Sequence, residues 1–327
     1  MSFPLYRRPG GILFLDDDPA YLEMLGDVMP DGWHVRLYMQ PADCIAALQN
    51  EAQRWEADAW KQQEMINRWH EGRPLIPQIL SYWKEDGTNR FDLTQVCVVD
   101  YSMPAMSGLR VLSEVKAWTG SRILLTGRAD ELLGVSAFNR GLIEKFIPKQ
   151  SPELRKRLTE AIGVLQAEPN ARHQNMWQST LSRDQNSLLE LPAMESDLQA
   201  LAVKHGWVEY ILIGAPFGML ALDSQGHAVW VQLEPAEKLS ELADMAESQG
   251  CSANEVQEIR AGRKLIDLEL RLAMGMEAKP ILRDAVTLGN DKTLRAALFE
   301  VDPSDCPGVA GSFANFVAQQ GERRLRG

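Results

Sequence analysis

The chain has 327 residues, of which 45% are hydrophobic and 24% are charged, a composition typical of globular proteins with room for about two domains. Its formal net charge of −11 argues against nonspecific nucleic-acid binding, because a phosphate backbone repels an acidic surface. No apolar run reaches the ~18 residues of a membrane span, so no membrane partner is predicted. The scattered cysteines form no Cys-x-x-Cys pattern, which predicts reduced thiols and a cytoplasmic location; they are Cys44, Cys97, Cys251 and Cys306.

Short apolar runs alternate with helical patterns along the first half of the chain. Each run ends at polar or turn-forming residues, as the buried strands of a parallel sheet do. Strands are predicted at 11–15, 34–39, 96–99, 122–126 and 143–147, and a helix is predicted after each of them. This alternation predicts an α/β fold, with a doubly wound five-stranded parallel sheet, over residues 1–167.

The second of these helices is unusually long. It is predicted to run from Pro41 to Glu71, and a short helix at 77–83 follows it, so a helical insert is expected over about residues 42–92. Apolar residues recur along the long helix in a heptad-like seam that is broken once by Gln62. The seam residues are Leu48, Ala52, Trp55, Ala59, Ile66 and Trp69. The pattern leaves two alternatives open: the seam packs on its own domain, or it forms a surface for a dimer or another partner.

Polar side chains follow four of the predicted strands. Asp16 and Asp17 follow the first, Asp100 the third, Thr126 the fourth and Lys149 the fifth. Because the carboxyl ends of parallel strands share one edge of the sheet, these side chains are expected to meet there. Neighbouring carboxylates repel one another unless a cation lies between them, and Mg²⁺ prefers such oxygen ligands. The predicted Mg²⁺ ligands are the carboxylates of Asp17 and Asp100 and the backbone carbonyl of Ser102.

The same residues have the functional groups that phosphoryl chemistry requires. A carboxylate is a competent nucleophile toward phosphorus, and a bound metal leaves room for a phosphoryl group beside it. The charge on the phosphoryl oxygens then needs the metal, a hydroxyl donor and a fixed cation. Thr126 and Lys149 are residues of these types.

This constellation resembles the receiver domain of two-component response regulators over roughly residues 10–167. The matching motifs are Asp16-Asp17-Asp18-Pro19, Asp100-x-x-Met103-Pro104-x-Met106-x-Gly108, Thr126-Gly127 and Lys149. The resemblance implies that Asp100 accepts a phosphoryl group from a sensor histidine kinase, and that Asp16 and Asp17 hold Mg²⁺. It also implies that Thr126 and Lys149 contact the phosphoryl group, and that Phe146 acts as a rotameric switch.

The chain departs from the receiver pattern in two places. Gln150 follows Lys149, where the family usually has proline, and this leaves the position of Lys149 open. The insert at about 42–92 lengthens the connection between the second and third strands, and it is expected to alter the face by which such domains meet partners. A homodimer, formed through the insert or through the receiver face, is therefore expected besides the kinase.

The polar stretch 168–176 is the predicted linker to an α+β output domain over residues 177–327. Helices are predicted at 177–204, 235–249, 252–274 and 313–319, and strands at 208–213, 219–223, 229–233, 280–288 and 293–301. Turn residues between the first three strands predict an antiparallel meander, and the last two strands form a hairpin around 289–291. Ser252 and Glu255 form a capping box at the start of the third helix.

The second half carries no catalytic motif that predicts an enzyme. Residues 172–327 hold 15 Lys and Arg against 22 Asp and Glu, so the basic face that DNA-binding proteins need is not predicted. Arg260, Arg263 and Lys264 are expected in the middle of a helix, on a solvated face. The predicted output is a module that acts by dimerisation or by binding a ligand or partner, and a DNA-binding transcriptional regulator and a receiver-controlled enzyme are the alternatives.

The whole architecture is similar to the response regulators of α-hydroxyketone quorum-sensing circuits. The local similarity lies in Ala137-Phe-Asn-Arg-Gly-Leu-Ile143, and it accompanies a receiver with a long insert and an α+β half. In that group the output is thought to resemble nucleotide-binding domains. The similarity implies a phosphorelay regulator in a quorum-sensing system, and it assigns no role to any residue of the second half.

Overall fold

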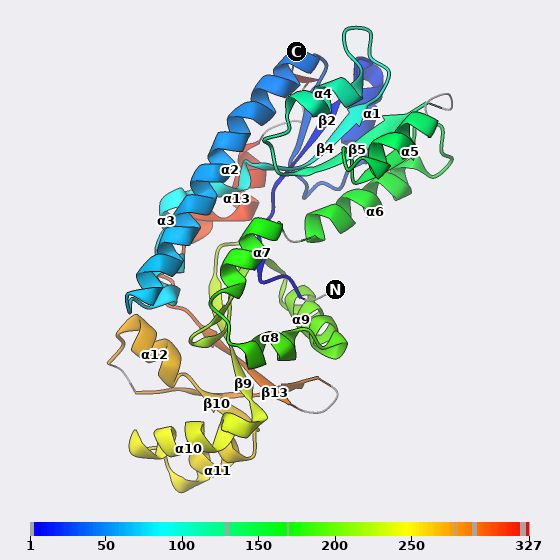
Figure 1. The fold of residues 1–327 in the computed structure, drawn as a ribbon. Helices are drawn as coiled ribbons and strands as arrows, with labels where there is room; N and C mark the ends of the chain where they lie inside the picture. The colour runs from blue at the N-terminus through cyan, green and yellow to red at the C-terminus, as the bar shows by residue number, and fades with distance from the viewer. Residues whose placement is uncertain are drawn as a thin grey trace. The chain divides into compact units, whose positions relative to one another are not determined.

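The computed structural model describes residues 3–127, 131–168, 170–277, 279–289, 293–320 and 325–326. Its contacts divide the chain into two compact units, each assembled from separate segments, whose elements are drawn in Figure 1. The parallel-sheet unit comprises residues 9–61, 88–170 and 315–327, and the antiparallel-sheet unit comprises residues 1–8, 62–87 and 171–314.

This division differs from the predicted one at three places, because residues 1–8 and 62–87 belong to the antiparallel-sheet unit and residues 315–327 to the parallel-sheet unit. Helix α2 (Pro41–His70) therefore supplies its N-terminal part to one unit and its last turns to the other. The reason is apolar burial. Ile66 and Trp83 are fully buried in the same cluster as Trp177, so this part of the insert completes the core of a segment that follows much later in the chain.

The parallel-sheet unit has the predicted doubly wound α/β fold. Its parallel strands are β2 (Gly11–Leu15), β3 (Val35–Tyr38), β4 (Thr94–Asp100), β5 (Ser121–Thr126), β6 (Lys145–Pro148) and the short β14 (Leu325–Arg326). They lie in the order β14-β3-β2-β4-β5-β6. The five predicted strands are confirmed, and β14 adds one that was not predicted. The chain order reverses between β2 and β4, where ligands of such sheets bind.

Helices cover both faces of this sheet (Figure 1). Successive residues of a strand point to opposite faces, and accordingly Ile12 and Phe14 of β2 lie in one apolar cluster while Leu13 and Leu15 lie in the other. The first cluster is closed by α1 (Pro19–Val28) and α6 (Leu154–Ala167). The second is closed by the start of α2, by α4 (Gly108–Glu114) and by α5 (Glu131–Asn139).

The antiparallel-sheet unit contains a sheet whose strands differ in length and lie in the order β1-β7-β8-β9-β13-β12. The strands are β1 (Tyr6–Arg7), β7 (Trp207–Gly214), β8 (Phe217–Asp223), β9 (Ala228–Pro235), β12 (Val286–Leu288) and β13 (Leu294–Glu300). The predicted meander of β7, β8 and β9 is confirmed by their antiparallel pairing. Strand β12 pairs with β13 as a hairpin, and the predicted turn residues Asn290 and Asp291 lie outside the described residues.

Its helices are shorter than predicted at two places. Helices α7 (Ala171–Gln178), α8 (Arg183–Leu189) and α9 (Pro192–His205) replace the single helix expected at 177–204. The breaks arise because Ser182 and Gln185 cap α8 and Pro192 starts α9. Helix α7 also begins inside the predicted linker, so the connection after α6 is short.

The prediction of one continuous helix at 252–274 is also wrong. Helix α11 (Ala253–Arg260) starts at the predicted Ser252–Glu255 capping box but ends before Gly262, which has a left-handed φ of 66°. Strand β10 (Lys264–Ile266), which pairs with β11 (Leu282–Asp284), and helix α12 (Leu268–Met274) follow. Helices α3 (Leu75–Asp86), α10 (Leu239–Ser248) and α13 (Phe313–Gln319) complete the helices of the chain's described part. Arg260, Arg263 and Lys264 therefore do not lie in the middle of a helix.

The heptad-like seam of α2 is buried within the chain. Leu48 and Trp55 pack in the core of the parallel-sheet unit, whereas Ile66 and Trp69 pack in the core of the antiparallel-sheet unit. The alternative that the seam packs on its own domain therefore holds for Leu48 and Trp55, whereas Ile66 and Trp69 pack in the antiparallel-sheet unit. Trp60, which lies off the seam, is exposed.

Candidate functional site

The candidate site lies at the carboxyl ends of β2 and β4, which are neighbours in the parallel sheet. Leu15, the last residue of β2, pairs with Val99 of β4. Asp16 follows Leu15, and Asp100 is the last residue of β4. The sheet register therefore places these two acids side by side at the position where the strand order reverses.

Three carboxylates gather there. Asp16 and Asp100 are only 1% and 3% exposed, whereas Asp17 is exposed. One carboxylate oxygen from each of the three lies within 4.8 Å of the others. The Asp16 carboxylate also accepts a hydrogen bond from the backbone N–H of Asp18 at 3.1 Å, and the Asp18 side chain N-caps α1.

Lys149 provides the positive charge at this cluster. Its Nζ lies 2.6 Å from Oδ2 of Asp16 and 3.0 Å from Oδ1 of Asp100. Burial lowers the pKa of the Lys149 ammonium, but hydrogen bonds to the two carboxylates outweigh this effect and raise the pKa overall. Burial raises the pKa of Asp16, although the hydrogen bond from Lys149 offsets part of the increase. Lysine thus neutralises carboxylates that would otherwise repel one another.

The peptide after Lys149 settles the question that Gln150 raised. Within the described residues, the cis peptide bond is Ala215–Pro216, so Lys149 and Gln150 are joined by a trans peptide. The backbone N–H of Lys149 donates to the carbonyl of Thr126 at 2.9 Å. This bond fixes the chain beyond β6, and Lys149 reaches both acids without the proline that is usual in receivers.

Thr126 and Phe146 occupy different surroundings. Thr126 ends β5, and its Oγ1 is buried and has no hydrogen-bond partner. Because an unpaired buried hydroxyl is costly, this oxygen is a candidate donor to a group that is bound there. Phe146 of β6 is half-buried, and its ring lies against Gly134 of α5. Ser102 is exposed in the loop after β4.

Two residues that the sequence reasoning assigned no site role also shape the cluster. The Lys149 ammonium lies 4.6 Å from the ring centre of Tyr21, a cation–π distance. Burial raises the pKa of the Tyr21 phenol, and the nearby carboxylates add to this effect. At Gly108, a side chain would collide with the carbonyl oxygen of Asp100. The glycine of the Asp100 motif was the available signal for this close approach, whereas Tyr21 was visible only as a helix-face residue.

The donor set fits a hard divalent cation. Carboxylate oxygens are the ligands that Mg²⁺ takes in proteins, and the three acids present such oxygens close together. The unpaired Oγ1 of Thr126 points to a further bound group at the same edge. Asp16, Asp17 and Asp100 are thus suited to hold the ion, and the carbonyl of Ser102 stays a prediction.

The strand order is that of a doubly wound α/β fold, and the acid–lysine cluster lies at the edge where this order reverses. Among solved structures, that of the Legionella pneumophila response regulator LqsR is similar over 98% of this chain and 98% of that chain, at 20% identity and a TM-score of 0.72. The predicted resemblance to response regulators is thus confirmed at the level of the fold, over both units. No protein-family model and no curated protein sequence matches the chain.

Shorter chains are similar to about half of this chain. A response regulator receiver domain protein from Clostridium thermocellum is similar over 48% of this chain and 93% of its own, at 21% identity and a TM-score of 0.31. A CheY-like receiver domain protein from Methanospirillum hungatei is similar over 48% of this chain and 94% of its own, at 17% identity and a TM-score of 0.33.

Throughout the described residues, no helix has both the length and the apolar character needed to cross a membrane.

Proposed function

We propose that the protein is a response regulator of a phosphorelay in which Asp100 accepts a phosphoryl group from a sensor histidine kinase. The observation that supports this most is the buried Asp100 carboxylate, which lies within a cluster of three acids and 3.0 Å from the Lys149 ammonium. An acid at the end of a central strand, beside a metal-type cluster and a fixed cation, is placed for phosphoryl transfer.

The transfer follows from the residues in place. An Asp100 carboxylate oxygen attacks phosphorus, the phosphorus–nitrogen bond to the kinase histidine breaks, and that histidine takes up a proton. Lys149 then turns from a carboxylate to the phosphoryl oxygens, and the unpaired hydroxyl of Thr126 donates to them. Mg²⁺, held by Asp16, Asp17 and Asp100, would supply further positive charge.

The phosphoryl group is proposed to switch the antiparallel-sheet unit, whose output is dimerisation or the binding of a ligand or partner, and not an enzymatic reaction. Phe146 is the proposed relay, since its half-buried ring lies against α5. The four cysteines are free thiols, which supports a role in the reducing cytoplasm. A place in a quorum-sensing circuit is proposed on the sequence similarity alone.

Intact-mass measurement after treatment with phosphoramidate and MgCl₂ tests the phosphoacceptor. The wild type is expected to gain one phosphoryl group, and Asp100→Asn is expected to gain none, because an amide is no nucleophile toward phosphorus. Asp31→Asn, at an exposed acid away from the cluster, is the matched control and is expected to label like the wild type. EDTA is expected to stop labelling. Labelling of Asp100→Asn equal to that of the wild type would show that another residue is the acceptor.

A further inference from the structure

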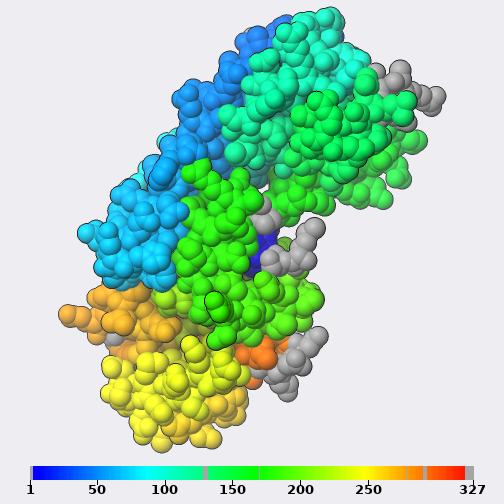
Figure 2. Space-filling view, viewed as in Figure 1, coloured from blue at the N-terminus to red at the C-terminus, as the bar shows by residue number. Residues whose placement is uncertain are grey.

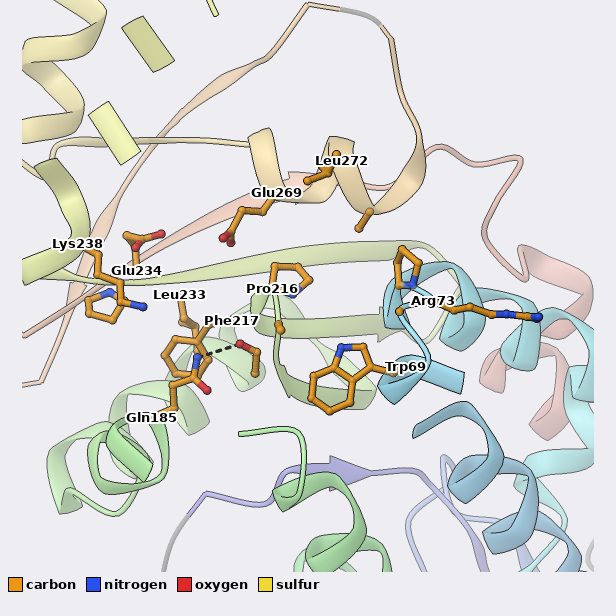
Figure 3. Close-up of a pocket in the computed structure, with 16 residues that line it drawn as sticks. Trp69, Arg73, Gln185, Pro216, Phe217, Leu233, Glu234, Lys238, Glu269 and Leu272 are labelled. Carbon is orange, nitrogen blue, oxygen red and sulfur yellow. Dashed lines mark hydrogen bonds between the residues drawn. The ribbon is translucent and has the colours of Figure 1, made fainter. Parts of the chain in front are cut away.

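A cavity of about 370 Å³ lies in the antiparallel-sheet unit, around the turn that joins β7 to β8. All residues that line it belong to this one unit. Its apolar walls are formed by Trp69, Pro74, Pro216, Phe217, Leu233 and Leu272. Gln185 holds the turn in place by donating from Nε2 to the carbonyl of Gly214 at 2.9 Å (Figure 3). The volume suits a small organic molecule.

Two carboxylates enter this apolar space. Glu234 lies near the end of β9 and is only 8% exposed, and Glu269 lies in the first turn of α12 and is half-buried. Figure 3 shows the Glu269 side chain extending from α12 into the space above the β7–β8 turn, with Glu234 on the β9 side. In the described part of the chain neither carboxylate forms an ion pair. A buried carboxylate without a cationic partner is costly.

Neither of the cations that line the cavity forms an ion pair with these two acids in the described part of the chain. Figure 3 shows that the Arg73 side chain extends away from the two acids. Lys238 is exposed, and it acts on both acids only through its charge at a distance. Aromatic walls such as Trp69 and Phe217 also attract cations through their ring faces. The two acids without an ion pair and the aromatic walls therefore both favour a positively charged ligand.

The pKa of Glu234 is raised, as expected for a buried carboxylate that has no cationic partner. Burial raises its pKa to about 7, the charges of Glu269 on α12 and Glu241 on α10 add to this effect, and Gln232 and Lys238 oppose it. Burial also raises the pKa of Glu269. A cation between the two acids would stabilise both ionised forms.

We propose that this cavity binds a small organic amine, with its ammonium group between Glu234 and Glu269 and its aromatic or apolar body against Trp69, Pro216 and Phe217. The ligand would also cover Leu272, an apolar side chain at the mouth that is 85% exposed. Leu272 belongs to α12, part of the orange surface in Figure 2. The proposal does not depend on phosphorylation of Asp100, so a failure of the phosphoryl assay leaves it standing.

Calorimetric titration of the full chain with three probes of one ring system tests the charge preference. Tryptamine carries an ammonium group, tryptophol is neutral, and indole-3-propionate carries a carboxylate. At pH 8 tryptamine is expected to bind about tenfold more tightly than tryptophol or better, because a charge-assisted contact is stronger than a neutral one. Indole-3-propionate is expected not to bind. Equal binding of the acid and the amine, or no tryptamine binding up to about 10 mM, would overturn the proposal.

Variants locate the binding site. Glu234→Gln and Glu269→Gln keep the shape of the side chains and remove one charge each, and each is expected to weaken tryptamine binding about tenfold or more. Glu247→Gln, at an exposed position on α10 outside the cavity, is expected to leave the affinity unchanged. Thermal melting identifies a variant that fails to fold, and the other glutamate variant then provides the test. Wild-type affinity in both folded variants would contradict the assignment.

Discussion

Lys149 shows how one side chain sets the state of the candidate phosphorylation site. Its ammonium bridges Asp16 and Asp100 at 2.6 and 3.0 Å, so its positive charge lies between two acids that are nearly fully buried. Removing the lysine would leave these acids buried and uncompensated, which is costlier than never having paired them. Under the proposed function, the same charge would become available to a phosphoryl group, because phosphoryl oxygens compete for the donors that now contact the carboxylates.

Glu234 makes a residue-scale prediction about pH. Burial raises its pKa to about 7 from an ordinary value of 4.5, so the folded state holds a proton that the unfolded state releases earlier. The contribution of this proton to stability is full below pH 4.5 and is lost as the pH rises through about 7. The free energy of unfolding of Glu234→Gln, taken relative to that of the wild type, should therefore be higher at pH 8 than at pH 5, by at most about 3 kcal/mol.

Urea unfolding of both proteins at the two pH values measures this gain. Glu247→Gln, which removes an exposed carboxylate, is expected to show no such change relative to the wild type. A Glu234→Gln protein whose stability relative to the wild type is the same at both pH values would show that Glu234 titrates normally.

At the scale of the element, α2 depends on a polar residue that interrupts its apolar seam. Gln62 is fully buried; its Oε1 accepts from Trp177 Nε1 at 2.9 Å, and its Nε2 donates to Tyr6 Oη at 3.3 Å. Gln62→Leu would fit the heptad pattern but would leave the indole N–H of Trp177 without this acceptor. We expect a loss of about 2 kcal/mol in the free energy of unfolding, measured by urea denaturation.

The neighbouring residue provides the control. Gln63 is half-buried, and its Nε2 donates to Oδ1 of the exposed Asn67 at 3.1 Å, one turn later on α2, so Gln63→Leu is expected to change stability by less than about 0.5 kcal/mol. Equal losses of unfolding free energy in the variants at positions 62 and 63 would mean that the hydrogen bonds of the buried amide do not stabilise the fold.

Helices α5 and α6 expose apolar side chains, and the predicted homodimer through the receiver face would bury them. Its exposed residues are Leu132, Leu133, Val135, Phe138 and Val164, and Phe138 and Val164 also line a hollow of about 470 Å³ together with Phe146. Phosphorylation is expected to promote association through this face, and Val164→Glu to weaken it about tenfold or more, because an interface would bury an unpaired charge. Light scattering with and without phosphoramidate measures the mass.

Val203→Glu is the matched control for this face. Val203 is the same residue type and is more exposed, at 70% against 48% for Val164, but it lies on α9, so its variant is expected to associate like the wild type. A phosphorylated protein that stays monomeric, or a Val164→Glu protein that dimerises normally, would remove the receiver face as the interface.

At the scale of the whole molecule, each of the two units is assembled from segments that lie far apart in the sequence. A fragment of residues 1–167 retains α3 and the end of α2 but lacks the segment that buries them, so Ile66, Ile76 and Trp83 lose their apolar cluster. This fragment is expected to bind the apolar dye ANS strongly and to aggregate. A matched fragment of residues 9–167, with a glycine–serine linker in place of 62–87, is expected to bind less dye. Equal dye binding would show that residues 62–87 fold without the later segment.

The parallel sheet and its site residues were open to prediction because their signals are local. A five-residue apolar run such as 11–15, followed by acids and a helix cap, predicts a buried strand end wherever it occurs. Parallel strands then bring Asp16, Asp100 and Lys149 to one edge by topology alone. What this reasoning missed at the site was Tyr21, since a helix-face pattern does not reveal which charged group a ring will contact.

The sequence by itself determined the fold class, the strands of the parallel sheet and the edge where their acids gather, because these follow from periodicity and from the residues that end each run. Only the tertiary structure decided that residues 62–87 complete the second unit, that Gln62 contacts Trp177, 115 positions away, and that Glu234 and Glu269 share a cavity. These features depend on burial between distant segments, and burial is a property of the packed chain that no local pattern records.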